Sequence, residues 1–157
     1  MSDSETIDVY NQQIDEYLAL AEDLQEEYAL DSFARRVIPN GHILDLGCGP
    51  GAASAVLQDQ GFSVDAVDAS AEMVRVAKSQ YKVEARCGEF SDINEESVYD
   101  GIWANFSLLH ATSDELPEIL SSLHRALKLN GYFHIGMKVG EGSVSYTHLR
   151  AHESPRD

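Results

Sequence analysis

The first forty residues carry apolar side chains at helical spacing. Positions three and four residues apart are apolar, namely Ile7, Tyr10, Ile14, Tyr17, Leu18, Ala21 and Leu24. Because this spacing places side chains on one face of a helix, it predicts an amphipathic helix over about 5–28. A second helix is predicted over about 31–37, with Asp31 as its N-cap, and the sequence "PNG" ends it. We therefore expect an N-terminal helical cap over 1–40.

Beyond Gly41 short apolar runs alternate with helical segments. The predicted strands are 43–46, 62–67, 83–87, 101–105 and 132–137, and the predicted helices are 52–60, 71–80 and 114–127. Such alternation is typical of βαβ units with parallel strands. The pattern therefore predicts an α/β fold, a Rossmann-like doubly wound sheet that is mainly parallel.

The first predicted strand leads into a glycine-rich turn, "HILDLGCGPGA". Gly47, Gly49 and Ala52 satisfy G-x-G-x-x-A, the pattern of a dinucleotide site. Asp45, Gly47, Gly49 and Gly51 equally satisfy D-x-G-x-G-x-G. In an open parallel sheet ligands bind beyond the carboxyl ends of the strands, and this turn lies there. The turn alone leaves the ligand open between NAD and S-adenosylmethionine.

Two acids narrow the choice of ligand. Asp68 ends the second predicted strand, 21 residues after Gly47, where a carboxylate accepts hydrogen bonds from ribose hydroxyls. Asp45 places a second carboxylate near the turn, which would repel a pyrophosphate and favour the ammonium of S-adenosylmethionine. We therefore expect the methyl donor rather than NAD.

Five segments in order carry a family resemblance: "ILDLGCGPG", "VDAVDASAEMVRVAK", "CGEFSDI", "YDGIWANFSLLH" and "LHRALKLNGYFHI". They resemble the motifs of class I S-adenosylmethionine-dependent methyltransferases, and most closely the small-molecule enzymes of the tellurite-resistance and ubiquinone-biosynthesis type. The resemblance implies strand order 3-2-1-4-5 and an N-terminal helical cap. It also implies methyl transfer from S-adenosylmethionine to a small-molecule acceptor.

The resemblance implies donor-binding residues from all of the first four segments. They are Asp45, Gly47, Cys48, Gly49, Gly51, Asp68, Ala69, Met73, Glu89, Phe90, Asn105 and Phe106. The glycines would line the aminoacyl end, Asp68 would hold the ribose, and Ala69 and Met73 would border the adenine. Glu89 or Phe90 would lie beneath its exocyclic amine, although a solvated loop acid explains Glu89 nearly as well.

Three residues are candidates for the acceptor side of the site. His110 is the candidate general base, because its pKa suits proton removal near neutrality; alternatively it only begins a loop. Tyr10 and Tyr17 lie seven residues apart on one helical face and would close over the pocket, although core packing explains the spacing better.

The order of the family motifs breaks after "GMKVGEGS", residues 136–143. The family has a helix and two further strands after the fifth strand, and the remaining residues are too few to form them, so these strands are expected to be missing. The segment "VSYTHLRAHESPRD" resembles translated sequencing adaptor, so we interpret 143–157 as a non-native tail on a truncated core, 41–142. The fifth strand would then form an exposed edge, through which we expect self-association.

Composition restricts the partners. Eleven Lys and Arg against 27 Asp and Glu give a net charge of −16, which disfavours nucleic acid and anionic membranes. No apolar run reaches the ~20 residues of a membrane span, and the N-terminus does not resemble a secretory signal, so we expect a cytoplasmic protein. Cys48 and Cys87 are the only cysteines, and no metal site is expected.

The sequence thus predicts a methyltransferase that uses S-adenosylmethionine. Two alternatives stay open at this point. One is an NAD-dependent oxidoreductase, favoured by the G-x-G-x-x-A pattern alone. The other is a catalytically inactive fragment that binds the nucleoside.

Overall fold

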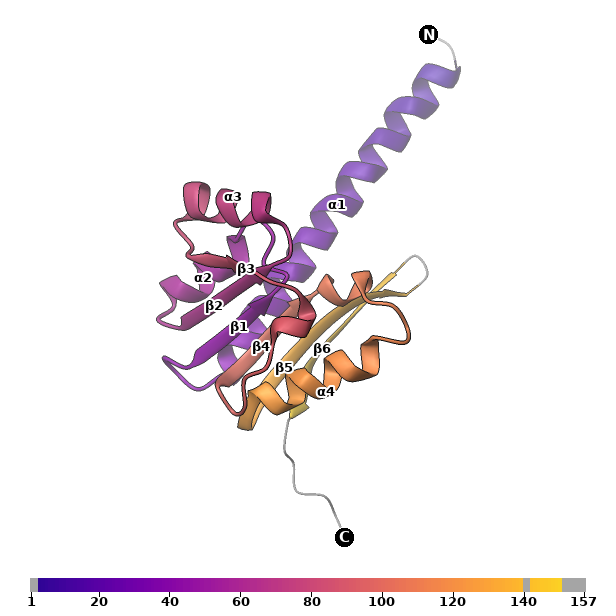
Figure 1. Cartoon of the computed structure of the whole chain (residues 1–157). Helices are drawn as coiled ribbons and strands as arrows, with labels where there is room; N and C mark the ends of the chain where they lie inside the picture. Colours follow the sequence, from indigo (N-terminus) through magenta and orange to yellow (C-terminus); the bar gives the residue numbers. More distant parts are fainter. Residues whose placement is uncertain (1–2, 140–141, 151–157) are drawn as a thin grey trace. The chain divides into compact units, whose positions relative to one another are not determined.

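A computed structural model describes residues 3–139 and 142–150, with side chains over 11–109 and 111–137. The chain divides into two compact units, Met1–Ser32 and Phe33–Asp157. Most of the first helix forms the first unit, and the sheet with its flanking helices forms the second (Figure 1).

The N-terminal segment is one helix, α1 (Asp3–Arg36), and not the two predicted. Asp31 lies inside this helix, because neither glycine nor proline interrupts the chain before Pro39. In its last turn Phe33 is fully buried, and Val37, just beyond the helix, is 3% exposed. Whether the helix caps the pocket stays a prediction.

Six strands form a single sheet in the order β3-β2-β1-β4-β5-β6. The strands are β1 (His42–Leu46), β2 (Ser63–Asp68), β3 (Ala85–Cys87), β4 (Tyr99–Asn105), β5 (Leu127–Val139) and β6 (Gly142–Arg150). All neighbours from β3 through β5 pair in parallel. The predicted order 3-2-1-4-5 and the parallel, Rossmann-like character are therefore confirmed.

Helices cover both faces of the sheet (Figure 1). They are α2 (Ala52–Asp59), α3 (Ala71–Tyr81) and α4 (Leu116–Ala126), with short 3-10 helices η1 (Phe90–Asp92) and η2 (Ser107–His110). On one face Leu123 of α4 lies in a buried core cluster with Leu44 of β1 and Ile102 of β4. On the other, Ala77 of α3 packs with Ala66 of β2. Strands buried on both faces are typical of parallel sheets, which explains their apolar runs.

Strand β5 begins earlier than predicted, at Leu127. Leu127 pairs with Tyr99, and the ladder then resumes at Tyr132 opposite Gly101. The residues between them leave the ladder, and Asn130 adopts a left-handed conformation with φ of 66°. The predicted Asn130-Gly131 turn is thus an irregularity inside β5. The strand begins before this turn because Leu127 is buried in the same core cluster as Leu44, Ile102 and Leu123.

The C-terminal segment corrects a second expectation. β6 pairs antiparallel with β5 from Val139↔Gly142 to Tyr132↔Arg150, so the edge of β5 is covered. The expected exposed edge was wrong, because backbone pairing with β5 does not require apolar periodicity. The predicted self-association rested on that edge and loses its basis. The assignment of 143–157 as a non-native tail stays a prediction, and 151–157 lie outside the described residues.

Among the helices that the structure describes, none is long and apolar enough to cross a membrane.

Gly101 of β4 allows the side chains of Phe33 and Val37 to pack closely on this strand. A β-carbon on Gly101 would lie 2.8 Å from side-chain atoms of both Phe33 and Val37. We expect Gly101→Ala to lower the free energy of unfolding by roughly 1–3 kcal/mol, as overpacking does. Denaturant titration measures the change. Val56→Ala on the exposed surface of α2 is the control, expected within about 0.5 kcal/mol of wild type. An unchanged Gly101→Ala variant would contradict this packing.

Candidate functional site

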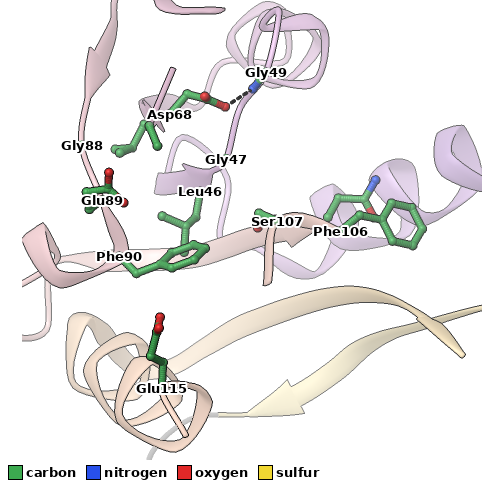
Figure 2. A pocket seen from close by; sticks show the side chains of 13 residues that line it. Leu46, Gly47, Gly49, Asp68, Gly88, Glu89, Phe90, Phe106, Ser107 and Glu115 are labelled. Atoms are coloured by element: carbon green, nitrogen blue, oxygen red, sulfur yellow. Dashed lines mark hydrogen bonds between the residues drawn. The ribbon is translucent and has the colours of Figure 1, made fainter. Parts of the chain in front are cut away.

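A hollow of about 440 Å³ lies at the carboxyl ends of β1, β2 and β4 (Figure 2). Its lining comprises Leu46, Gly47, Gly49, Val67, Asp68, Ala69, Gly88, Glu89, Phe90, Asn105, Phe106, Ser107 and Glu115. Parallel strands bring their carboxyl ends to one edge, where ligands of open α/β sheets bind. Eight of the twelve predicted donor-binding residues therefore lie together. The size is in the usual range of small-molecule sites.

Asp68 joins the glycine turn to the end of β2. Its Oδ2 accepts a hydrogen bond from the Gly49 N–H at 2.8 Å, and its Oδ1 accepts one from the Ser70 N–H at 2.8 Å. Figure 2 shows the first of these bonds. Each carboxylate oxygen can accept a second hydrogen bond, so Asp68 is fixed in place and still able to bind hydroxyl groups.

The glycines of the turn have different roles. A β-carbon on Gly47, whose φ is 75°, would overlap Ser107, so this glycine lets η2 pack onto the turn. A β-carbon on Gly49 would meet no atom within 4 Å. Gly51 packs closely against Ala77 of α3 instead of lining the pocket. Only Gly49 therefore offers open space for a ligand beside the backbone.

Asp45 does not line the pocket, contrary to the expectation that it faces the ligand's ammonium. It is 2% exposed, and the Ser54 hydroxyl donates to its Oδ2 at 2.6 Å, which ties α2 to β1. Burial raises the pKa of this carboxyl to about 6, the Ser54 hydrogen bond opposes the shift, and nearby Asp68 adds to it. The alternation of β1 turns Asp45 to the face opposite Leu44 and Leu46.

Two other predicted residues also lie outside the lining, Cys48 and Met73. Cys48 is 8% exposed and packs with Ala77 and Val83. Burial, together with the charge of Asp45, raises the pKa of its thiol to about 12. The thiol therefore stays protonated near neutrality, which fits a packing role. Met73 donates its backbone N–H to the N-cap hydroxyl of α3.

The opposite wall of the pocket comes from the segment after β3. Gly88, Glu89 and Phe90 line it, and the Glu89 N–H donates to Asp92 Oδ2 at 2.7 Å, which fixes the start of η1. In Figure 2 the Phe90 ring lies beside Leu46, and Glu115 extends toward Phe90 from the start of α4. An aromatic face and a carboxylate are suited to a planar ring that carries an amino group.

The end of β4 supplies the third wall. Asn105 closes the strand, and Phe106 follows with φ of 63°, an unusual conformation for a large side chain. The Phe106 N–H donates to the Gly136 carbonyl at 2.8 Å. Such backbone strain is common at ligand sites. The strained residue turns the chain from β4 into η2, which brings Ser107 onto the glycine turn.

The acceptor-side roles of Tyr10, Tyr17 and His110 stay predictions. Tyr17 lies on α1 in the first unit, where its side chain is 71% exposed. The side chains of Tyr10 and His110 lie outside the described residues, although the His110 backbone ends η2. A role of His110 as a base stays a prediction.

Sequence reasoning missed five lining residues: Leu46, Val67, Gly88, Ser107 and Glu115. Leu46, Val67 and Ser107 each adjoin a predicted site residue in the sequence, and Gly88 belongs to a quoted motif. Glu115 had no such signal, because it enters the pocket through the placement of α4.

The charge of the lining is its most informative property. The described residues that line the pocket include three carboxylates, on Asp68, Glu89 and Glu115, and no lysine or arginine. Within the described part of the chain, no three His, Cys, Asp or Glu side chains form a group that could hold a metal ion and so offset these negative charges. A pocket of this charge favours a cation and disfavours a pyrophosphate.

Comparison with known proteins agrees with this geometry. Residues 43–131, more than half of the chain, match a family described as a methyltransferase domain. This chain belongs to the methyltransferase domain family. The matched residues include all the lining described above.

Individual relatives support the same family. The methyltransferase domain is 33% identical over 93 residues to a malonyl-[acyl-carrier protein] O-methyltransferase from Pseudescherichia vulneris, covering 57% of this chain and 36% of the relative. It is 28% identical over 130 residues to a carboxy-S-adenosyl-L-methionine synthase from Idiomarina loihiensis, covering 74% and 52%.

A solved structure extends the likeness over most of the chain. A TehB-like SAM-dependent methyltransferase from Corynebacterium glutamicum has a TM-score of 0.63 and 28% identity, covering 90% of this chain and 78% of that one. S-adenosylmethionine is thus the methyl donor named for this relative. The methyltransferase domain spans about half or less of the length of the curated relatives it matches.

We expect the buried Asp45 to make the stability of this domain depend on pH. Its pKa of about 6 when folded exceeds the ordinary 3.8, so the folded state binds more protons than the unfolded state between these values. Stability should therefore fall as the pH rises through that window and stay lower above it, by at most about 3 kcal/mol.

Asp45→Asn keeps an acceptor for Ser54 and removes the titration. We expect its free energy of unfolding to lose less than that of wild type between about pH 4.5 and about pH 7.5. Denaturant titration at both pH values measures this, with the exposed Asp59→Asn as control. An equal loss in wild type and Asp45→Asn would refute the assignment.

Proposed function

We propose that this methyltransferase domain binds S-adenosylmethionine in the pocket and transfers its methyl group to a small-molecule acceptor. The observation that carries the proposal is the charge of the lining: three carboxylates and no basic residue among the described lining residues. S-adenosylmethionine carries a sulfonium and an ammonium, whereas NAD carries a pyrophosphate. The pocket therefore favours the first ligand electrostatically.

We assign a region of the pocket to each part of the donor. Asp68 is fixed by two backbone N–H groups and can accept from the ribose hydroxyls. The open side of Gly49 leaves room for the aminoacyl chain. Ala69 and Phe90 border the region for the adenine, with Glu89 available to its exocyclic amine.

The relatives favour assigning the matched segment to the donor. The named activities of the Pseudescherichia and Idiomarina proteins differ, yet both match this domain. A segment common to proteins with different reactions is best explained by a shared donor. We infer that the acceptor site lies beside Asn105 and Phe106, at the end of β4.

Methyl transfer from a sulfonium requires of the protein mainly that it positions the donor and the acceptor. The sulfonium supplies an already activated methyl group, so the chain's task is to hold donor and acceptor in line. Phe106 and Ser107 are fixed by the strained turn after β4, which gives this wall a defined position. We therefore assign catalysis to positioning and to exclusion of water, without requiring a base.

Calorimetry with S-adenosylhomocysteine and NAD tests the proposal. We expect S-adenosylhomocysteine to bind and NAD not to bind. Asp68→Asn should weaken binding of S-adenosylhomocysteine by about 10- to 100-fold, because a neutral amide offers the ribose and the two backbone N–H groups one acceptor oxygen in place of two charged ones.

Asp59→Asn makes the same chemical change at an exposed position of α2 and should bind like wild type. Binding of NAD without S-adenosylhomocysteine would contradict the proposal and favour the oxidoreductase alternative.

A further inference from the structure

Asn105 is held by a neighbour that lies outside the pocket lining. His134 Nε2 on β5 is 3.2 Å from Asn105 Oδ1. An amide oxygen only accepts hydrogen bonds, so this contact places the imidazole proton on Nε2. The amide oxygen of Asn105 is thereby engaged on the side of β5, and its NH2 group is left as the polar group for other partners.

The surroundings of His134 hold its ring in one orientation. The side chain is fully buried, and its ring stacks on Trp103 with centroids 3.9 Å apart and an angle of 14° between the planes. The ring of Phe33 meets the imidazole edge-on, with the two ring centroids 6.4 Å apart. Burial lowers the pKa of His134 to about 4, so the imidazole is neutral near pH 7 and carries a single N–H.

Gly136 makes room for this arrangement. It pairs with Asn105 in the ladder, and a β-carbon on Gly136 would overlap Asn105 Oδ1. The backbone bond from the Phe106 N–H to the Gly136 carbonyl fixes the two strands at this level. The space above Gly136 and the N–H of His134 together define where the amide oxygen lies.

We propose that His134 is a positioning residue that turns the Asn105 NH2 group to the pocket, where it donates to the carboxylate of the methionine chain. This inference rests on the proposed function. The described lining has three carboxylates and no basic side chain, so an anionic group of the donor needs a neutral hydrogen-bond donor. Without the hydrogen bond to His134, the amide oxygen of Asn105 would face the pocket as readily as the NH2 group and would repel the donor's carboxylate.

Two ligands separate positioning from general stability. S-adenosylhomocysteine has the aminoacyl chain, and 5′-methylthioadenosine lacks it. His134→Phe keeps a ring for the stack on Trp103 and removes the N–H. We expect it to weaken S-adenosylhomocysteine by about tenfold in calorimetry, the effect of losing one hydrogen bond to a charged group. Binding of 5′-methylthioadenosine should be unchanged.

Two further variants make the test independent of the phenylalanine. His134→Gln restores an N–H donor and should bind S-adenosylhomocysteine within about threefold of wild type. Gly136→Ala displaces the Asn105 oxygen without altering either side chain and should reproduce the ligand-selective loss. Tyr99→Phe removes a hydrogen bond to Asp65 elsewhere in the sheet and is the matched control, expected to bind both ligands normally.

The outcomes distinguish this inference from the proposed function. If wild type does not bind S-adenosylhomocysteine, both fail. If wild type binds, but His134→Phe binds like wild type or loses both ligands equally, the positioning role alone is overturned. Nitrogen-15 spectra of wild type give a second readout: the proton should be on Nε2, and a proton on Nδ1 alone would overturn the inference.

Discussion

The pocket depends on the Asp68 carboxylate, which accepts one hydrogen bond from Gly49 and another from Ser70. Gly49 belongs to the turn after β1, and Ser70 is the N-cap of α3 after β2. One side chain therefore fixes two neighbouring strand ends. Charge-assisted bonds of this kind are stronger than neutral ones, which suits a group that must stay in place while it binds a ligand.

Close packing at two glycines positions the end of β4 beside the ends of β1 and β2. Gly47 has no side chain, so Ser107 lies directly against the turn, and the third strand end is brought to the same edge. Gly136 performs the corresponding role for Asn105. Both glycines thus admit a neighbouring residue of the protein, whereas Gly49 faces open space. Residues that look alike in the sequence pattern therefore perform different tasks in the structure.

Much of this architecture was predictable from the sequence. The alternation of apolar runs and helices predicted every parallel strand, and the positions of Gly49 and Asp68 predicted the pocket. Three features were not predictable in this way. β6 pairs through its backbone, so its side-chain pattern carried no signal. Asp45 turns to the buried face, and the contact of Asn105 with His134 depends on strand register.

The central claim is that a methyl donor binds at this edge of the sheet. The most direct measurement is a titration of the nitrogen-15 labelled chain with S-adenosylhomocysteine, followed by the backbone amide signals. The account predicts that the signals of Gly49, Gly88 and Asn105 shift, while those of His42 and Tyr99, at the opposite ends of their strands, do not. Shifts confined to His42 and Tyr99, or no shifts at all, would contradict it.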